Sequence, residues 1–544
     1  MSTHEVFNQP PPLENLNLFT SDAALVDAVS REGAGAFIDD LARFGELLGR
    51  PESIRLGFEA NENTPVLKTH DRFGNRLDEV DYHPSWHELM RLSVENGLHS
   101  GPWKTDKPGS HVARAAKMFL MSQAEFGHLC PISMTYSVVP ALRKQPDVAA
   151  EWETLITSSV YDRRFVPASR KKGVILGMGM TEKQGGSDVR ANTTRAVPQG
   201  KGGPGGEYVV TGHKWFVSAP MSDAFLILAQ APKGLSCFLL PRWKPDGTKN
   251  PFFIQRLKNK LGNRSNASGE VEIDGAWARM VGEEGRGVPT IIEMVNHTRL
   301  DCTIGSSSLM RQALVQALHH TGHRNAFGKT LIDQPLMRNV LADLAVESEA
   351  ATLLAMRLAH AYDHENDGFE DAFRRIATAV SKYWICKRAP SHVYEALECL
   401  GGGGFVEESI LPRLYREAPV NAVWEGSGNV IALDVLRAAQ KEPKTLEALI
   451  AEIKKASDIR LDHHLDRILN AAKKIPADES LARRLVEGLA LALQASLLLR
   501  RGHPAVAEAF LASRLGGDWG HAFGTLPATA DLAAIIERAR PKVG

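Results

Sequence analysis

The sequence predicts an α+β protein in which helical regions flank a central β-domain. Between residues 21 and 165, apolar residues recur at three- and four-residue spacings, a pattern typical of amphipathic helices. From about residue 172 to 282, short runs rich in β-branched and aromatic residues alternate with Gly, Pro, Asp and Lys turns. Helical spacing then returns and continues through the remaining residues.

The length of the chain predicts several domains. Its 544 residues exceed the roughly 250–300 at which a single hydrophobic core stops growing, so we expect two to four domains. From the changes of period we place an N-terminal helical domain, a β-domain, a helical bundle and a C-terminal helical domain. Their bounds are residues 1–171, 172–285, 286–440 and 441–544.

Charge and composition exclude several classes of function. Lys plus Arg and Asp plus Glu both number 64, so the whole chain has no general attraction to nucleic acid or acidic membranes. The five cysteines are scattered without C-x-x-C spacing, which favours free thiols in a reducing compartment. The N-terminus lacks the pattern of a secretory signal, and the most apolar stretch, 487–500, carries charged residues. We therefore expect a soluble, cytoplasmic protein.

The sequence lacks the context of a dinucleotide-binding domain and also lacks a P-loop. Strand and helix do not alternate from the start of the chain, no first strand-to-helix turn carries G-x-G-x-x-G, and GEEGRG at 282–287 is interpreted as a turn. His319, His320 and His323 stand close together in sequence but have no carboxylate or cysteine beside them. We interpret them as surface or pocket polar groups and expect no metal site.

A lone carboxylate, Glu425, lies between Trp424 and the flexible run Gly426–Gly428. One interpretation is a solvated glutamate in an ordinary Gly-Ser-Gly turn. The other is a catalytic base, because apolar surroundings disfavour the charged carboxylate and raise its pKa. The local sequence leaves both interpretations open.

Four segments, in this order, resemble motifs of the acyl-CoA dehydrogenase family. They are GMTEKQGGSD (179–188), HKWFVSAP (213–220), RNAFGKTLIDQPLMR (324–338) and ECLGGGGFVEESILPRLYREAPVNAVWEGSGN (398–429). The likeness extends from about residue 110 to 440. It implies an acyl-CoA dehydrogenase-like fold, FAD as the cofactor and Glu425 as the base that removes the α-proton of an acyl thioester.

The resemblance also assigns the residues around the flavin. In the β-domain it implies contacts from Met180, Thr181, Gly186, Ser187, Trp215, Phe216 and Ser218. In the helical bundle it implies contacts from Gly401, Gly402, Trp424, Ser427 and Asn429, while Arg324 and Gln334 reach the dinucleotide of a neighbouring subunit. A shared flavin implies a homo-oligomer, a tetramer in this family. The alternatives are ordinary strand and turn packing and, for Arg324, a surface helix charge.

Three positions depart from the usual family pattern. Glu398 replaces a glutamine near the pyrophosphate, Trp424 replaces a tyrosine, and Asn429 replaces a frequent acidic residue. These departures are compatible with FAD binding and predict weak or residual acyl-CoA turnover.

A narrower likeness is to the branch of this family that is induced in the bacterial adaptive response to DNA alkylation. It is carried by VFNQPPPLENLNLFTSDAAL (6–25), KLGNRSNAS (260–268), the WEGSGN variant and the extra C-terminal helical region. It implies duplex DNA binding through basic residues of the C-terminal region. Our principal candidates are Arg437, Lys454, Lys455, Arg500, Arg501 and Arg514, with Lys441, Lys444, Lys473, Lys474, Arg483 and Arg484 near them.

Charge alone does not predict this DNA site. Residues 441–544 hold only a small excess of Lys and Arg over Asp and Glu, as solvated helix faces also do. Because the sequence holds no helix-turn-helix or zinc-finger signature, we expect phosphate contacts with little base readout. Three hypotheses remain: a DNA-binding FAD protein of the alkylation response, a metabolic short- or branched-chain acyl-CoA dehydrogenase, and a non-catalytic flavin-stabilised scaffold.

Overall fold

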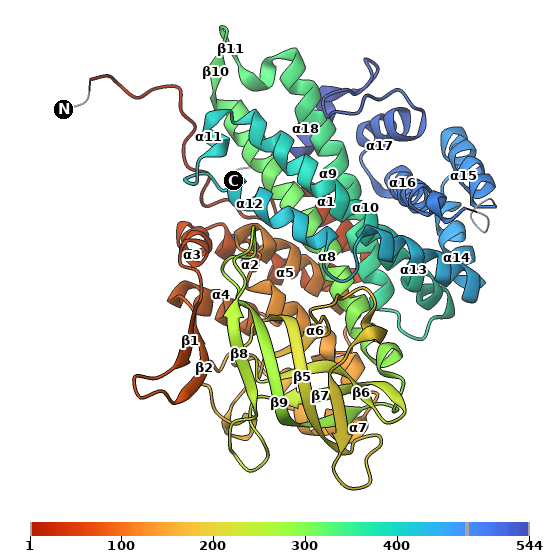
Figure 1. The fold of residues 1–544 in the computed structure, drawn as a ribbon. Coiled ribbons are helices and arrows are strands. Elements are labelled where there is room, and N and C mark those ends of the chain that lie inside the picture. Colours follow the sequence, from red (N-terminus) through yellow and green to blue (C-terminus); the bar gives the residue numbers. More distant parts are fainter. Residues whose placement is uncertain (1–2, 474–477, 542–544) are drawn as a thin grey trace. The chain divides into compact units, whose positions relative to one another are not determined.

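The computed structural model describes residues 3–473 and 478–541 and divides into two compact units. The helical unit comprises Met1–Ile54, Lys107–Ala124 and Arg299–Gly544, and the β unit comprises Arg55–Asp106 and Glu125–Thr298. The α+β class and its order of helices, strands and helices are confirmed (Figure 1). The division into four domains stays a prediction.

The centre of the β unit is a seven-stranded, mostly antiparallel sheet. Strand β6 pairs with β7 and with β4, and the path through β5 and β9 returns to β7, so five of the strands close into a ring. Closure removes exposed strand edges. The strands are β3 Leu176–Gly179, β4 Arg195–Pro198, β5 Glu207–Ser218, β6 Ala224–Ala231, β7 Gly234–Pro241, β8 Phe252–Leu257 and β9 Ser268–Val281.

Helices α6 (Leu129–Leu142) and α7 (Pro146–Ile156) supply the apolar cover of this sheet. Val138, Leu142 and Ile156 are buried in one cluster with Leu226 and Leu239 of β6 and β7. This core explains the continuous apolar runs of β6 and β7, because strands that are buried on both faces do not alternate.

The region before residue 165, for which we predicted helices, also contains a β-hairpin. Its strands are β1 (Val66–His70) and β2 (Arg76–Asp81). Its turn is organised by Asp71, whose Oδ1 accepts the N–H groups of Phe73 and Asn75. Gly74, with φ at 84°, completes the turn. Helix α3 (Pro51–Glu62) belongs to the β unit from Arg55 onward, and α4 (Pro84–Glu95) follows the hairpin in the β unit.

Three long helices dominate the helical unit (Figure 1). They are α8 (Gly287–His323), which belongs to this unit from Arg299 onward, α9 (Pro335–Tyr362) and α10 (Gly368–Cys399). A short hairpin, β10 (Asn325–Ala326) with β11 (Lys329–Thr330), connects the first two. The remaining α-helices are α1 Ala23–Val29, α2 Ile38–Leu48, α5 Ser110–Ala124, α11 Gly402–Phe405, α12 Leu411–Glu417, α13 Gly428–Lys441, α14 Pro443–Ile453, α15 Ile459–Ala472, α16 Ala482–Arg501, α17 Pro504–Phe510 and α18 Leu532–Ala539.

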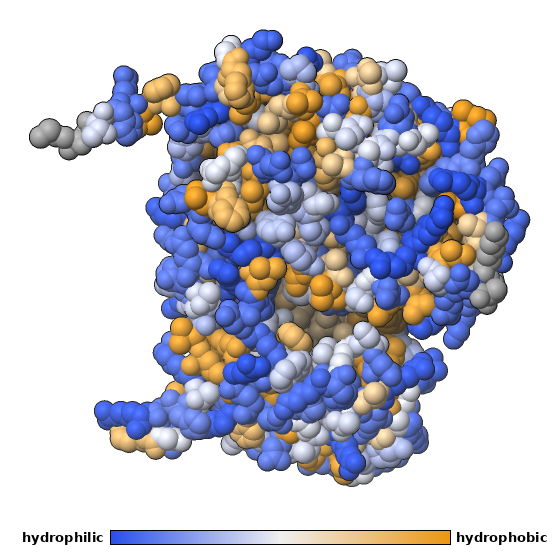
Figure 2. Space-filling view, turned by 45° about the horizontal axis from the view of Figure 1, so that its top comes forward, coloured by the Kyte–Doolittle hydropathy of each residue, from blue (hydrophilic) through white to orange (hydrophobic). Residues whose placement is uncertain are grey.

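The apolar stretch near 487–500 lies within α16, which is buried along most of its length. Helices α9, α10, α14 and α15 pack around it. Gly488 allows α15 to approach, because a Cβ at this position would lie 2.5 Å from Cγ2 of Ile468. Within residues 3–473 and 478–541, no helix is long and apolar enough to cross a membrane. Figure 2 shows that hydrophilic residues cover much of the visible surface, with apolar patches scattered among them.

Two buried ionic clusters fasten the C-terminal helices to α9 and α10. In the first, Glu452 of α14 accepts hydrogen bonds from Arg357, Arg500 and Lys455, and Arg357 also pairs with Glu370. Burial raises the pKa of Glu452, but the three cations outweigh burial and lower it to about 2. Glu452 is therefore ionised at neutral pH and connects α14 to α9 and α16 through its ion pairs.

The second cluster is centred on Arg514, whose side chain is 0% exposed. Its guanidinium pairs with Asp343 and with Glu347 at 3.0 Å, and Glu347 also pairs with Arg388 at 3.2 Å. Arg514 further lies 4.4 Å from the centre of the Trp519 ring. A buried guanidinium held by two carboxylates is not available to a DNA phosphate.

Replacing Arg514 by Met leaves Asp343 without its arginine in the interior. We expect Arg514→Met to lower the free energy of unfolding by about 3–5 kcal/mol, since breaking a buried pair strands a charge. Urea unfolding followed by circular dichroism measures this change. The control is Arg484→Ala on exposed α16 surface, for which we expect a change within about 0.5 kcal/mol. Equal stabilities of the two variants would contradict the structural role of Arg514.

Candidate functional site

The β unit brings the first two motif segments into direct contact. The N–H of Trp215 on β5 donates to the carbonyl of Thr181 at 2.8 Å, and the N–H of Lys183 donates to Nε2 of His213 at 3.0 Å. The amide of Asn192 donates to the carbonyl of Met180 at 2.9 Å. Segments 180–187 and 213–218, which are distant in sequence, therefore form one surface.

A buried ion pair that sequence reasoning did not identify supports this surface. Nζ of Lys214 on β5 lies 2.8 Å from Oε1 of Glu182, and both side chains are at most 1% exposed. Glu182 also accepts the backbone N–H groups of Thr193 and Thr194. Burial raises the pKa of Glu182, but Lys214 and these N–H donors outweigh burial and hold it well below the ordinary value. The pair fixes the loop at 180–187 to β5.

The aromatic residues predicted to contact the flavin are accompanied by a cation. Nζ of Lys258 lies 3.3 Å from the ring centre of Trp215 and 4.6 Å from that of Phe216. Trp215 is partly buried and Phe216 is exposed. Ser218 is partly buried with its Oγ 3.5 Å from that of Ser268. Gly186 packs against the Thr181 side chain, while Ser187 is exposed.

In the helical unit, Glu425 lies in a turn with an unusual backbone conformation. Its φ is +59°, in the left-handed region that non-glycine residues rarely adopt, and Gly426 follows with φ at +106°. Such strain persists only where surrounding contacts hold it, and it is common at functional sites. The strained backbone of Glu425 therefore argues against the interpretation as an ordinary solvated turn.

Two buried cations hold the three successive carbonyls of this turn. Nζ of Lys382 on α10 donates to the carbonyl of Trp424 at 2.7 Å and to that of Gly426 at 2.6 Å. Nε of Arg299 on α8 donates to the carbonyl of Glu425 at 2.9 Å. We call these three hydrogen bonds the carbonyl clasp. They fix the backbone from which the Glu425 side chain projects.

Asp434 on α13 supports the Arg299 side of the clasp. It accepts Nη1 of Arg299 at 2.7 Å and Nη2 of Arg375 at 3.1 Å. Burial raises the pKa of Asp434, but the two guanidinium groups outweigh burial and lower it. The aspartate is therefore ionised at neutral pH and holds Arg299 in place.

The neighbours of Glu425 are polar as well as apolar. Nε1 of Trp424 donates to Oδ1 of Asn421 at 3.0 Å, and Asn421 is 0% exposed with no partner for its Nδ2 among the described residues. Ser427 and Asn429 are exposed at the start of α13. Gly428 lies against α10, because a Cβ there would meet Nζ of Lys387 at 2.8 Å.

The third motif segment lies at the hairpin between α8 and α9. Nη1 of Arg324 donates to the carbonyl of Asn8 at 2.7 Å, and Nε2 of Gln334 donates to the carbonyl of Ala326 at 3.0 Å. Gly401 and Gly402 face open space, since a Cβ at either position would meet nothing within 4 Å. Nε2 of His319 donates to the carbonyl of Pro11 at 2.7 Å. Residues 3–473 and 478–541 hold no group of His, Cys, Asp and Glu side chains that could bind a metal ion.

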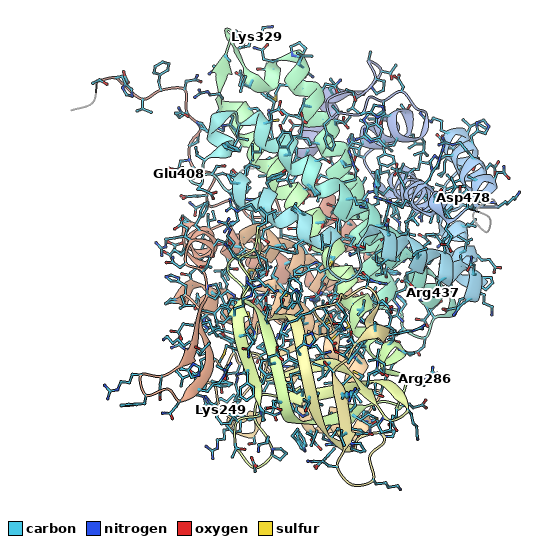
Figure 3. All side chains as sticks on the ribbon, in the orientation of Figure 1. Lys249, Arg286, Lys329, Glu408, Arg437 and Asp478 are labelled. Atoms are coloured by element: carbon cyan, nitrogen blue, oxygen red, sulfur yellow. The ribbon has the colours of Figure 1, made fainter. Side chains whose placement is uncertain are left out.

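The basic residues predicted to contact DNA fall into two groups. Arg437, labelled in Figure 3, is exposed together with Lys441, Lys444 and Lys454, and no ion pair engages these four within the described ranges. The other principal candidates are engaged: Lys455 and Arg500 pair with Glu452, Arg501 pairs with Glu32, and Arg514 is buried. Lys473, Arg483 and Arg484 are exposed, and Arg483 donates to the hydroxyl of Tyr383. Lys474 lies outside the described residues. Sequence reasoning did not separate these groups because their partners lie on distant helices.

The Glu182 and Lys214 pair predicts a pH-dependent contribution to stability. Because the folded-state pKa of Glu182 lies below its ordinary 4.5, the stabilisation is complete above about pH 4.5 and is lost as pH falls through the lowered pKa. We expect Glu182→Gln to lower the free energy of unfolding by about 3 kcal/mol at pH 7, with a smaller difference from wild type below pH 4.5. Urea titrations at several pH values measure both. Glu272→Gln, at an exposed pair with Lys183, is the control and should change stability by less than about 1 kcal/mol.

Three domain-family models match successive parts of the chain. Residues 8–163 match the adaptive response protein AidB N-terminal domain, 177–276 the acyl-CoA dehydrogenase middle domain, and 285–440 the acyl-CoA dehydrogenase C-terminal domain. AidB of Escherichia coli (strain K12) is 47% identical over 513 residues, which cover 93% of this chain and 94% of AidB.

The chain is also similar in sequence and in structure to proteins of Caenorhabditis elegans. Acyl-CoA dehydrogenase family member 11 is 32% identical over 80% of this chain and 73% of its own length. The crystal structure of ACDH-11 in complex with C11-CoA superposes with a TM-score of 0.83 and 27% identity, covering 99% of this chain and 94% of that one. The chain therefore belongs to the acyl-CoA dehydrogenase family, with an N-terminal domain of the AidB type.

Proposed function

We propose that the protein is an FAD-containing member of this family that binds double-stranded DNA in the response to DNA alkylation and retains weak acyl-CoA dehydrogenase activity. The observation that carries the catalytic part is the carbonyl clasp, because it fixes a strained turn around the one glutamate that the family motif assigns as base. The likeness to AidB supports the DNA part.

The residues present fit FAD. Gly401, Gly402 and Gly403 leave open space at their Cα atoms, so a phosphate could approach the backbone closely. The buried Nδ2 of Asn421, beside Trp424, is a donor without an acceptor among the described residues. In the β unit, the surface of 180–187 and 213–218 offers backbone groups and the Trp215 ring. FAD, when bound, would supply the acceptor for the hydride of the substrate β-carbon.

Glu425 then removes the α-proton of the acyl thioester. A carboxylate performs this step when it is held within reach of the proton and partly shielded from water. Glu425 is partly buried, and the clasp fixes the backbone that carries its side chain. Lys382 and Arg299 act through the turn and position the base without touching the substrate.

The exposed basic residues Arg437, Lys441, Lys444 and Lys454 are the surface we propose for DNA. Unpaired lysines and arginines can neutralise phosphates without first breaking an internal ion pair. We leave Arg500, Arg501 and Arg514 out of this surface because their guanidinium groups are already engaged by carboxylates. In an oligomer, each small basic surface would be repeated, which raises avidity.

Self-association as a homotetramer is part of the proposal. Phe327 at the hairpin tip is 100% exposed, Leu336 85% and Phe405 79%, all within the helical unit. Large apolar side chains that are this exposed favour an interface between protein chains. A second copy of this chain would bury them.

A metabolic acyl-CoA dehydrogenase without a DNA role is the second candidate. It is favoured by the C11-CoA bound to the similar ACDH-11 and by the family's acyl-CoA substrates. Weak turnover and DNA binding can also coexist in one chain, since the proposed base and the proposed basic surface use different residues.

Anaerobic addition of a short-chain acyl-CoA tests the catalytic part. We expect slow bleaching of the flavin absorbance in the wild-type holoprotein and at least about a hundredfold slower bleaching in Glu425→Gln, since a general base typically contributes that much. Glu447→Gln on exposed α14 surface is the matched control and should behave like wild type. A bleaching rate unaffected by Glu425→Gln would contradict its role.

Fluorescence anisotropy of a labelled DNA duplex tests the DNA part. We expect the wild-type protein to bind the duplex with an affinity that falls as salt rises. The Arg437→Ala/Lys441→Ala variant should bind more weakly whatever the DNA sequence, and the slope of log affinity against log salt concentration should be smaller by about one to two. Arg195→Ala/Lys201→Ala, which removes two exposed charges from the β unit, is the control. Truncation at residue 440 is unsuitable because it exposes buried Arg357. No binding at low salt would leave the metabolic candidate.

A further inference from the structure

The N-terminal segment before the first helix is attached to the hairpin that carries Arg324. Oδ1 of Asn8 accepts the N–H of Asn325 at 2.7 Å, and Nδ2 of Asn8 donates to the carbonyl of Asn325 at 2.9 Å. Asn325 also pairs with Thr330 across the hairpin. The amide side chain of Asn8 thus bonds to β10 in the way that a backbone peptide of a third strand would.

Asn8 makes its third hydrogen bond to Arg324 itself. The carbonyl of Asn8 accepts Nη1 of Arg324 at 2.7 Å. Asn8 has φ at +57°, a left-handed conformation that asparagine tolerates better than most residues. The nearby carbonyl of Pro11 contacts Nε2 of His319 at 2.7 Å, which holds the segment against the end of α8.

These contacts engage only part of the Arg324 guanidinium. Its Nε and Nη2 have no hydrogen-bond partner, and no carboxylate lies within ion-pairing distance of it, among the described residues. A guanidinium is a rigid planar fork with five donors, so fixing one nitrogen orients the others. Free donors held in a fixed plane suit a bidentate contact with a phosphate.

We propose that Asn8 is a positioning residue, which holds Arg324 and the β10–β11 hairpin so that the remaining guanidinium donors meet the pyrophosphate of a dinucleotide on a neighbouring copy of this chain. This inference rests on the proposed FAD binding and deepens it. The hairpin projects at the end of α8, where Lys329 is labelled in Figure 3. Asn8 acts through Arg324 and through Asn325, without contacting the cofactor.

The rate of FAD release from diluted holoprotein, followed by flavin fluorescence, tests the inference. Asn8→Gly keeps the backbone conformation and removes both side-chain hydrogen bonds, and Gln9→Gly is the matched control at an exposed neighbour. We expect about five- to tenfold faster release from Asn8→Gly and no change from Gln9→Gly. Arg324→Ala should release FAD at least as fast as Asn8→Gly, and the double variant no faster than Arg324→Ala.

The double variant separates positioning from a general loss of stability, because independent effects would multiply. The flavin-free forms of all four variants should unfold within about 2 °C of one another. Asn8→Gly behaving like Gln9→Gly, or effects that multiply in the double variant, would overturn the inference alone. Release of FAD from Arg324→Ala at the same rate as from wild type would overturn both the inference and the assignment of Arg324 to the cofactor. A wild-type protein that takes up no FAD would overturn the proposed function.

Discussion

The carbonyl clasp is the interaction on which the proposed chemistry depends. A positive φ is unfavourable for Glu425, although not for the glycine that follows it, and buried cations from α8 and α10 hold the turn in this conformation. The cations interact with backbone carbonyls, so the carboxylate of Glu425 is positioned without being neutralised through these bonds. Asp434 balances the charge of Arg299 and Arg375, which makes the arrangement tolerable in a buried place.

The same principle of paired interior charges organises the rest of the helical unit. Glu452 of α14 pairs with Arg357 of α9, with Arg500 of α16 and with Lys455 just after α14, while Arg514 joins the last part of the chain to α9. The C-terminal helices are therefore part of one compact unit with the long helices. Arg437, Lys441, Lys444 and Lys454 form no ion pair among the described residues, which separates these basic residues from those that hold the fold together.

Much of the fold could be predicted from sequence, because the change from period 3.6 to β-rich runs near residue 172 and back near 282 reflects local burial. The β1–β2 hairpin was missed because its strands are short and mostly polar. Glu425 stands out in the sequence through its motif, and its role as the base stays a prediction. Lys382, Arg299 and the pair of Glu182 with Lys214 were not identified from sequence. Their partners lie from 32 positions away, for Glu182 and Lys214, to 126 positions away, for Arg299 and Glu425, and φ cannot be read from residue type. The prediction that Arg514 contacts DNA was wrong for the same reason, because its partners Asp343 and Glu347 lie far away in sequence.

The most direct test of the clasp is exchange of the α-protons of butyryl-CoA in D2O by the holoprotein, measured by NMR without an electron acceptor. The account predicts exchange by wild type, none above background by Glu425→Gln, and at least about tenfold slower exchange by Lys382→Met. The control Ser391→Ala, on the exposed surface of the same helix, should exchange at a rate close to that of wild type. Exchange by Lys382→Met at the wild-type rate would contradict the claim that the clasp positions the base.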